Sequence, residues 1–322
     1  MRVLFWGTPD FAVPSLRALG EEGHQVVGVV TQPDRPAGRG RQVRPSPVKE
    51  FALSEGLQVF TPEKPRGESF MDSMRALDPE ISVVVAYGHI LVREVLDLPE
   101  RGSINVHASL LPELRGAAPI HWAIARGHEV TGVTIMRMAE AMDAGPILHT
   151  VEEPIGPRDT STELAARLSG VGAQALLEAL TLLELGDLPE VEQDHDRATY
   201  APKVSRALAR VDWAAPARTV ADLVRAMDAV PGSWTTLDGA PLKLFRPWLE
   251  PHDEGASEFA APAGEAAPGT VIDAEGGTER GLGVMAGDGP VWFAEVQPPG
   301  KRRMEVDAWL AGRGVEAGAH LE

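Results

Sequence analysis

The chain has 322 residues, of which 43% are hydrophobic, so it can bury a sizeable core and is long enough for two domains. It contains no cysteine, which excludes disulfides, thiolate nucleophiles and thiolate zinc sites. Its formal net charge of −17 argues against a protein that coats nucleic acid, because phosphate binding depends on clustered lysine and arginine. A local basic patch is compatible with this charge.

Alternating apolar runs dominate the first half of the chain. Residues 3–6, 26–31 and 81–86 predict strands, and the helical spacing of residues 11–19 and 48–53 predicts helices between them. This alternation is typical of βαβ units around a buried parallel sheet. Further strands are predicted at 103–107, 132–138 and 146–151, and further helices at 119–125 and 161–185.

The second half of the chain has a different pattern of residues. Residues 187–206 are polar and proline-containing, which suits a linker, and a helix is predicted at 219–227. Asp238-Gly239 is a strong hairpin signal between strands at 233–237 and 242–249. With short strands at 270–272, 283–285 and 291–296, about five strands favour a small β-barrel. We therefore predict an α/β protein with a Rossmann-like, mostly parallel sheet in residues 1–186, a linker at 187–206 and an OB-like barrel at 207–322.

No uninterrupted apolar stretch approaches the roughly 18 residues that span a bilayer. The apolar run at residues 3–6 meets Gly7 and Pro9 at once, without the longer apolar core of a signal peptide. We predict a cytoplasmic protein that does not enter a membrane.

Three polar residues are candidates for chemistry. Asn105 and His107 are two residues apart on a predicted strand, so both point to the same side, near the sheet edge where open α/β sheets bind ligands. Asp143 follows the next strand, in a turn before Gly145-Pro146. Taken singly, each is also ordinary as a strand-end or turn residue. A metal site is disfavoured, because asparagine is a poor transition-metal ligand and no second histidine lies at helical spacing.

Together these segments resemble a known family. Asn105, His107 and the run Ser109, Leu110, Leu111 and Pro112, followed by Asp143, resemble the signature of the folate-dependent formyltransferases. Segments 7–14, 31–40, 115–120, 212–213 and 300–303 are similar to the methionyl-tRNA formyltransferase branch, over essentially the whole chain. That branch usually has Gly-Leu-Asp-Thr-Gly around its carboxylate, whereas this chain has Ala141-Met142-Asp143-Ala144-Gly145.

The resemblance implies an activity and roles for these residues. The expected reaction moves a formyl group from 10-formyltetrahydrofolate to the amine of methionine on initiator methionyl-tRNA, without a metal or a covalent enzyme intermediate. Asn105 and a protonated His107 would donate to the developing oxyanion. Asp143 would favour the protonated imidazole and pass the amine proton, through water or directly, toward N10 of the departing folate. Folate contacts are expected at Ser109, Leu110, Leu111 and Pro112, and at Tyr87, Gly88 and Ile90 after the strand at 81–86.

Basic residues would contact the tRNA. Residues 35–49 contain no acidic side chain and are predicted to form a mobile loop that orders against the acceptor end, or else a solvated connection between a strand and a helix. OB-like barrels commonly hold nucleic acid, so the second domain is the other expected tRNA-binding part. The candidate residues are Arg35, Arg39, Arg41, Arg44, Lys203, Lys301 and Arg302.

Other functions are compatible with parts of this pattern. A formyltransferase that acts on an amino-sugar nucleotide is the nearest alternative, but the basic segment 35–49 and the opening residues 7–11 favour tRNA. A catalytically idle folate-binding or RNA-binding regulator would not need Asn105, His107 and Asp143 together. A dinucleotide-dependent dehydrogenase is disfavoured because no G-x-G-x-x-G follows the first strand. We predict that the protein is a monomer.

Overall fold

The computed structural model describes residues 1–37, 42–249, 266–274, 281–312 and 314–322. The chain divides into two compact units. The first unit comprises Met1–Pro119, Val130–Pro154 and Ala165–Pro202, and the second comprises Ile120–Glu129, Ile155–Leu164 and Lys203–Glu322. The predicted domain boundaries at residues 186 and 206 stay predictions.

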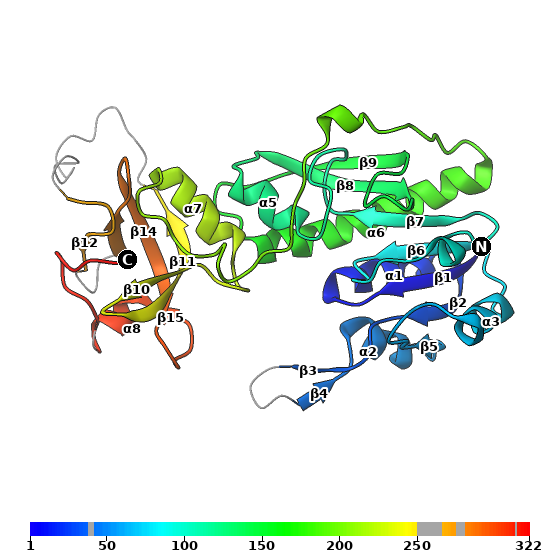
Figure 1. Cartoon of the computed structure of the whole chain (residues 1–322), viewed down its shortest axis with the longest axis horizontal. Coiled ribbons are helices and arrows are strands. Elements are labelled where there is room, and N and C mark those ends of the chain that lie inside the picture. Colours follow the sequence, from blue (N-terminus) through cyan, green and yellow to red (C-terminus); the bar gives the residue numbers. More distant parts are fainter. Residues whose placement is uncertain (38–41, 250–265, 275–280, 313) are drawn as a thin grey trace. The chain divides into compact units, whose positions relative to one another are not determined.

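The first unit is built on a seven-stranded sheet in the order β5-β2-β1-β6-β7-β8-β9 (Figure 1). Strands β5, β2, β1, β6 and β7 are parallel to one another; β8 is antiparallel to β7, and β9 is antiparallel to β8. This confirms the predicted Rossmann-like, mostly parallel sheet. The bounds are β1 Arg2–Gly7, β2 Gln25–Val30, β5 Val59–Phe60, β6 Ile81–Val85, β7 Ser103–His107, β8 Val130–Arg137 and β9 Ile147–Pro154.

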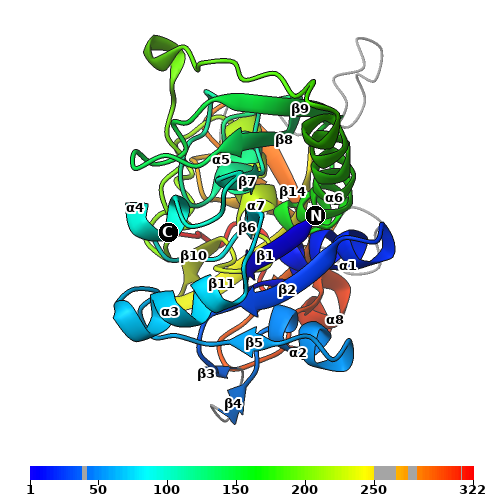
Figure 2. The same ribbon diagram turned by 90° about the vertical axis from the view of Figure 1, so that its right-hand side faces the viewer.

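Helices cover both faces of this sheet, which explains why its central strands are apolar on both sides. Figure 2 shows α1 and α6 on one face and α3 and α4 on the other. Met71 and Met74 of α3 join Leu4 and Trp6 of β1 in one core cluster. The bounds are η1 Asp10–Ala12, α1 Val13–Glu21, α2 Pro47–Ser54, α3 Glu68–Ala76, α4 Arg93–Leu96, α5 Pro119–Ala125, α6 Ser161–Leu185 and η2 His195–Arg197.

The helices at α5 and α6 confirm their predicted ranges. β5, α3 and α4 were not predicted from the sequence, because each buries few side chains, which leaves little periodic signal. Helix α6 is long and apolar enough to cross a membrane by length and composition alone, a test that core helices also pass. Of its most apolar window, 44% is buried, and Gly172 packs against Val106 and Val133 of the sheet.

The basic segment that was predicted as a loop contains a hairpin. Strands β3 (Arg35–Ala37) and β4 (Gln42–Arg44) pair antiparallel, with Arg35 opposite Arg44. Helix α2 follows after Ser46, whose hydroxyl accepts a hydrogen bond from the Lys49 amide at 3.1 Å. The described ends of the basic segment are therefore held by strand pairing and a helix cap.

The second unit contains a curled antiparallel sheet in the order β10-β11-β14-β13-β12, with β15 paired to β14. Isolated bridges join Leu321 to Leu237 and His320 to Thr270, so the last residues of the chain connect the two edges of the sheet. This confirms the predicted barrel and the hairpin at Asp238-Gly239. The bounds are α7 Ala217–Ala226, β10 Trp234–Leu237, β11 Ala240–Trp248, β12 Val271–Asp273, β13 Leu282–Met285, β14 Pro290–Gln297, β15 Met304–Glu305 and α8 Val306–Leu310.

Candidate active site

Strand β7 presents Asn105 and His107 near its carboxyl end. Both side chains are largely buried, with 9% and 6% of their surface exposed. Asn105 pairs with Val84 of the parallel strand β6, and His107 pairs with Thr134 of the antiparallel strand β8. Because the side chains of a strand alternate, the two residues lie on one face, as predicted.

The structure brings His107 and Asp143 together. Nδ1 of His107 lies 3.7 Å from Oδ2 of Asp143. The other ring nitrogen, Nε2, lies 3.1 Å from the carbonyl oxygen of Leu114. A carbonyl oxygen can only accept, so Nε2 carries a hydrogen and Nδ1 is the nitrogen that faces the carboxylate. A neutral His107 therefore presents a lone pair at Nδ1, and a protonated His107 presents a donor.

Asp143 is held by backbone groups of two segments. Its Oδ2 accepts a hydrogen bond from the Gly116 amide at 2.8 Å. Its own backbone has φ 50°, in the left-handed region, and the Ala144 amide donates to the Ala141 carbonyl at 3.3 Å to close the turn. The loop at 141–145 therefore forms a defined turn with alanine at two of the three positions where this chain departs from the family pattern.

Among the described residues, no group of three or more histidine, aspartate or glutamate side chains could hold a metal ion.

The predicted folate segment at 109–112 is braced internally. Ser109 is fully buried, its hydroxyl donates to the Glu113 carbonyl at 2.6 Å, and its carbonyl accepts from the Thr134 hydroxyl at 2.7 Å. The Leu111 amide donates to the same hydroxyl oxygen at 3.1 Å. Leu111 is buried, whereas Leu110 and Pro112 stay partly exposed. Folate binding by these four residues stays a prediction.

The second predicted folate segment follows β6. The Tyr87 ring is buried against Trp6, with the ring centroids 5.3 Å apart, and burial raises the pKa of its hydroxyl to about 12. The Tyr87 carbonyl accepts from the Thr8 hydroxyl at 3.0 Å and from Gln32 Nε2 at 3.2 Å. The Tyr87 side chain is thus part of the core, and the exposed part of this segment is Gly88 and Ile90.

The predicted tRNA residues lie in both units. In the first unit Arg35 and Arg44 are exposed, and Arg35 Nη2 donates to Gln32 Oε1 at 2.7 Å. Arg39 and Arg41 lie outside the described residues. Lys203, Lys301 and Arg302 are exposed on the second unit. None of these placements tests RNA binding.

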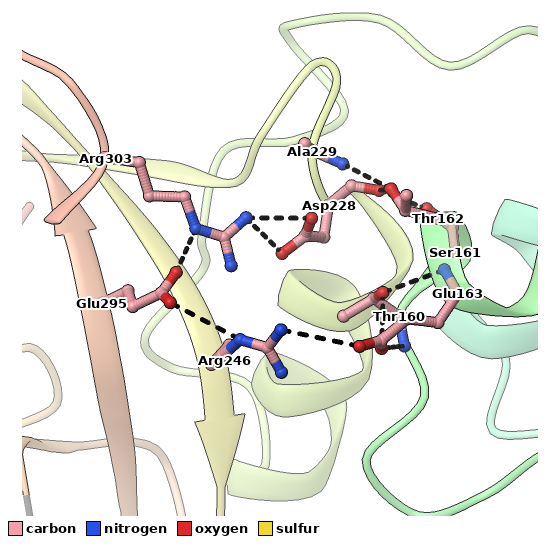
Figure 3. A network of polar contacts seen from close by, with 9 residues as sticks. All are labelled: Thr160, Ser161, Thr162, Glu163, Asp228, Ala229, Arg246, Glu295 and Arg303. Carbon is pink, nitrogen blue, oxygen red and sulfur yellow. Dashed lines mark hydrogen bonds and ion pairs between the residues drawn. The ribbon is translucent and has the colours of Figure 1, made fainter. Parts of the chain in front are cut away.

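Arg303 follows Lys301 and Arg302, and its side chain is bonded to other residues of the protein. Its Nη1 lies 3.0 and 2.9 Å from the two carboxylate oxygens of Asp228, and its Nε donates to Glu295 (Figure 3). Its guanidinium carbon lies 4.1 Å from the centroid of the Phe245 ring. Burial opposes the charge, but the hydrogen bonds that Arg303 donates to Asp228 and Glu295 outweigh it and raise the pKa of Arg303. Arg303 is therefore a structural cation.

These residues line a cavity of about 640 Å³ in the second unit. Thr160, just before α6, and Thr162 and Glu163 in its first turn contribute to the lining. Arg246 lies between Glu163 and Glu295, 3.6 and 3.5 Å from them (Figure 3). Hydrogen bonds from Thr160 lower the pKa of Glu163. Most of the charges in this cavity are already paired within the protein.

Sequence reasoning missed two residues near Asp143. Gln193 is buried, and its Nε2 donates to the backbone carbonyls of Asp143 and Gly145 at 2.9 and 2.7 Å. Its Oε1 accepts from Arg115, which is also buried. Arg115 belonged to a segment noted for its family resemblance, but nothing in the local sequence connects it to Gln193.

Sequence reasoning also missed a basic cluster in the second unit, made of Arg206, Arg210 and Lys243 around Trp234. The two guanidinium carbons lie 5.1 and 5.7 Å from the ring centroid of Trp234. Burial, and then the charge of Arg206, lower the pKa of Lys243. Arg206 and Arg210 are exposed. The only sequence signal is three cations in an acidic chain, spread over 37 positions, from 206 to 243.

Comparisons with known proteins identify the family of this chain. Residues 1–180 match the family described as formyl transferase, and residues 203–314 match the formyl transferase C-terminal domain. A methionyl-tRNA formyltransferase of Symbiobacterium thermophilum is 46% identical, over 100% of this chain and 95% of that protein. One of Bacillus velezensis is 43% identical, over 98% of this chain and 96% of that protein.

A solved structure shares the fold. HypX from Aquifex aeolicus in complex with tetrahydrofolic acid superimposes with a TM-score of 0.64 and 20% identity, over 97% of this chain and 47% of that one. Both family matches and the full-length identities point the same way: the chain belongs to the methionyl-tRNA formyltransferase family.

Proposed function

We propose that this protein transfers the formyl group of 10-formyltetrahydrofolate to the amino group of methionine on initiator methionyl-tRNA. The observation that carries the proposal is the pairing of His107 with Asp143 at 3.7 Å, beside Asn105, in a chain that matches formyltransferases over its whole length. We propose further that it acts as a cytoplasmic monomer, without a metal and without entering a membrane.

The three polar side chains suit formyl transfer to an amine. The reaction builds negative charge on the formyl oxygen, and donors already aimed at that oxygen lower the barrier. The Asn105 amide and the protonated Nδ1 of His107 are two such donors. Asp143 takes the proton that the attacking amine loses, directly or through water, and passes it toward N10 of tetrahydrofolate, which leaves as its bond to the formyl carbon breaks. Since Nε2 of His107 is engaged by Leu114, the orientation of the ring is set before substrate arrives.

The folate would bind at the carboxyl edge of β6 and β7. The two strands are parallel, with Val84 opposite Asn105, so the segment after β6 lies beside the polar residues of β7. Gly88 and Ile90 on one side, and Leu110 and Pro112 on the other, offer exposed backbone and apolar surface to a pterin ring. Ser109, Leu111 and the Tyr87 ring support these segments from the core.

The tRNA would bind through exposed cations of both units. Arg35, Arg39, Arg41 and Arg44 are proposed to contact the acceptor end, and Lys203, Lys301 and Arg302 the phosphate backbone. The cluster of Arg206, Arg210 and Lys243 around Trp234 joins this set, because arginine can contact phosphates while an aromatic ring stacks on an unpaired base.

One assay tests the acceptor. The protein is incubated with 10-formyltetrahydrofolate and, separately, charged initiator methionyl-tRNA, charged elongator methionyl-tRNA and an amino-sugar nucleotide, and formyl transfer to the amine is measured. We expect formylmethionyl-tRNA from the initiator alone. Transfer to the amino sugar, and none to tRNA, would instead establish the alternative activity, which the names of the full-length relatives disfavour.

A further inference from the structure

A chain of buried polar groups runs from Arg115 through Gln193 to the loop that carries Asp143. Arg115 and Gln193 are 4% and 5% exposed. Nε and Nη2 of Arg115 donate to Gln193 Oε1 at 3.1 and 2.6 Å, and Nη2 also contacts Nδ1 of His195 at 2.9 Å. Nε2 of Gln193 then donates to the backbone carbonyls of Asp143 and Gly145.

The direction of these hydrogen bonds is determined by chemistry. An arginine side chain only donates, so the oxygen of the Gln193 amide must face Arg115 and its nitrogen must face the loop. A guanidinium that is buried beside neutral partners is costly to desolvate. Within the described chain, the side chain of Arg115 bonds to Gln193 and His195.

The backbone on both sides of Arg115 holds the two candidate catalytic side chains. The carbonyl of Leu114 accepts from Nε2 of His107 at 3.1 Å, and the amide of Gly116 donates to Asp143 at 2.8 Å. The side chain of Arg115, which lies between Leu114 and Gly116 in the sequence, is linked to the backbone carbonyl of Asp143 through Gln193. The carboxylate and the backbone of Asp143 are thus tied to one tripeptide.

We propose that Gln193 and Arg115 are positioning residues, which set the Asp143 carboxylate relative to Nδ1 of His107 for formyl transfer. The inference rests on the proposed function. Without the two bonds from Gln193, the loop at 143–145 would be free to shift, and a displacement of about 1 Å at a reacting group can cost about a hundredfold in rate.

The test uses two substitutions: one removes both the acceptor and the donor of the Gln193 amide, and the other removes only the donor. Gln193→Met removes both ends and keeps the volume. Gln193→Glu keeps an acceptor for Arg115 but loses both donors and turns a carboxylate oxygen toward the carbonyls of Asp143 and Gly145. We expect kcat about tenfold to a hundredfold lower in both variants, with KM for each substrate within about threefold. Gln174→Met, at an exposed glutamine of α6, is the control and should match the wild type.

A double-mutant cycle with Asp143→Asn distinguishes positioning from a general structural role. If Gln193 acts through Asp143, Gln193→Met should change the single-turnover rate by less than about threefold once Asp143 has already been replaced. Equal losses in both backgrounds, or wild-type kcat in both Gln193 variants, would overturn the inference. Thermal unfolding identifies a variant that fails to fold, in which case the Glu variant decides. Absence of formylation by the wild type in the same assay would instead reject the proposed function, and this inference with it.

Discussion

The amide nitrogen of Gly116 lies 2.8 Å from Oδ2 of Asp143, and it donates this hydrogen bond from a backbone position that suits only glycine. Gly116 has φ 120°, and a Cβ there would lie 2.7 Å from the carbonyl oxygen of Ala201. The amide that orients the carboxylate is therefore placed by a close approach of two backbone segments.

Gly116→Ala should damage both stability and activity. The left-handed backbone and the contact with Ala201 predict a loss of about 2 kcal/mol in the free energy of unfolding. Because the amide is displaced, we expect kcat to fall by about tenfold or more. Denaturant unfolding and steady-state formylation measure the two effects. Gly20→Ala in α1 is the matched control, since no atom lies within 4 Å of a Cβ there. It should leave activity unchanged and raise the free energy of unfolding by up to about 1 kcal/mol, because alanine favours a helix more than glycine does.

His107→Ala should lower kcat for formylation by about a hundredfold to ten-thousandfold at saturating substrates, because it removes a donor to the developing oxyanion and the ring that faces Asp143. The fold should survive, since the ring makes one hydrogen bond to Leu114. His128→Ala in the second unit is the control. Near-wild-type turnover by the His107 variant would remove this residue from the catalytic assignment.

Replacing Arg206 and Arg210 by glutamine should weaken tRNA binding and its dependence on salt. Each phosphate contact that is lost should lower the slope of log Kd against log salt by roughly 0.7 to 0.9. Binding is measured by titration at several salt concentrations. The control is Arg75→Gln, because Arg75 is already paired with Asp72 and Glu94. An unchanged slope in the double variant would exclude the basic cluster from the RNA interface.

Arg303→Ala should instead act on stability. Asp228 is 6% exposed, and losing its bidentate partner leaves a buried carboxylate uncompensated. We expect the free energy of unfolding of the second unit to fall by about 2 kcal/mol or more. The salt dependence of tRNA binding by the folded variant should stay at the wild-type value. Arg302→Ala is the neighbouring comparison and should show the reverse pattern.

Glu163 makes the start of α6 sensitive to acid. Its carboxylate accepts from the amide and hydroxyl of Thr160, and these bonds lower its pKa. A carboxyl whose pKa is lower in the folded state stabilises the fold above its unfolded-state pKa, and this contribution is lost as pH falls through the folded value.

Glu163→Ala should therefore cost about 1 kcal/mol of unfolding free energy at neutral pH, as loss of a helix cap does. The difference from the wild type should shrink progressively below about pH 4.3, the ordinary range for glutamate. Urea unfolding at several pH values measures it. Glu21→Ala, at an exposed position of α1, should show no such trend, and a pH-independent difference for Glu163 would contradict the explanation.

The amino-acid sequence by itself determined most elements of the fold, because their signals are local. Strand period placed Asn105 and His107 on one face of β7, helical period delimited α6, and Asp238-Gly239 marked the β10–β11 hairpin. The mostly parallel character of the sheet also followed from the alternation of strands and helices, since parallel strands need crossovers. The family resemblance then supplied roles that no local pattern contains.

Tertiary structure alone decided which polar groups are tied together. Arg303 differs from Lys301 and Arg302 because Asp228, 75 positions away, accepts its charge. Gln193 reaches Asp143 across 50 positions, and the constraint on Gly116 comes from Ala201. Side-chain hydrogen bonds and close backbone approaches join residues that are distant in the chain, so their geometry is defined only after the core has packed and brought those segments within 3 Å of one another.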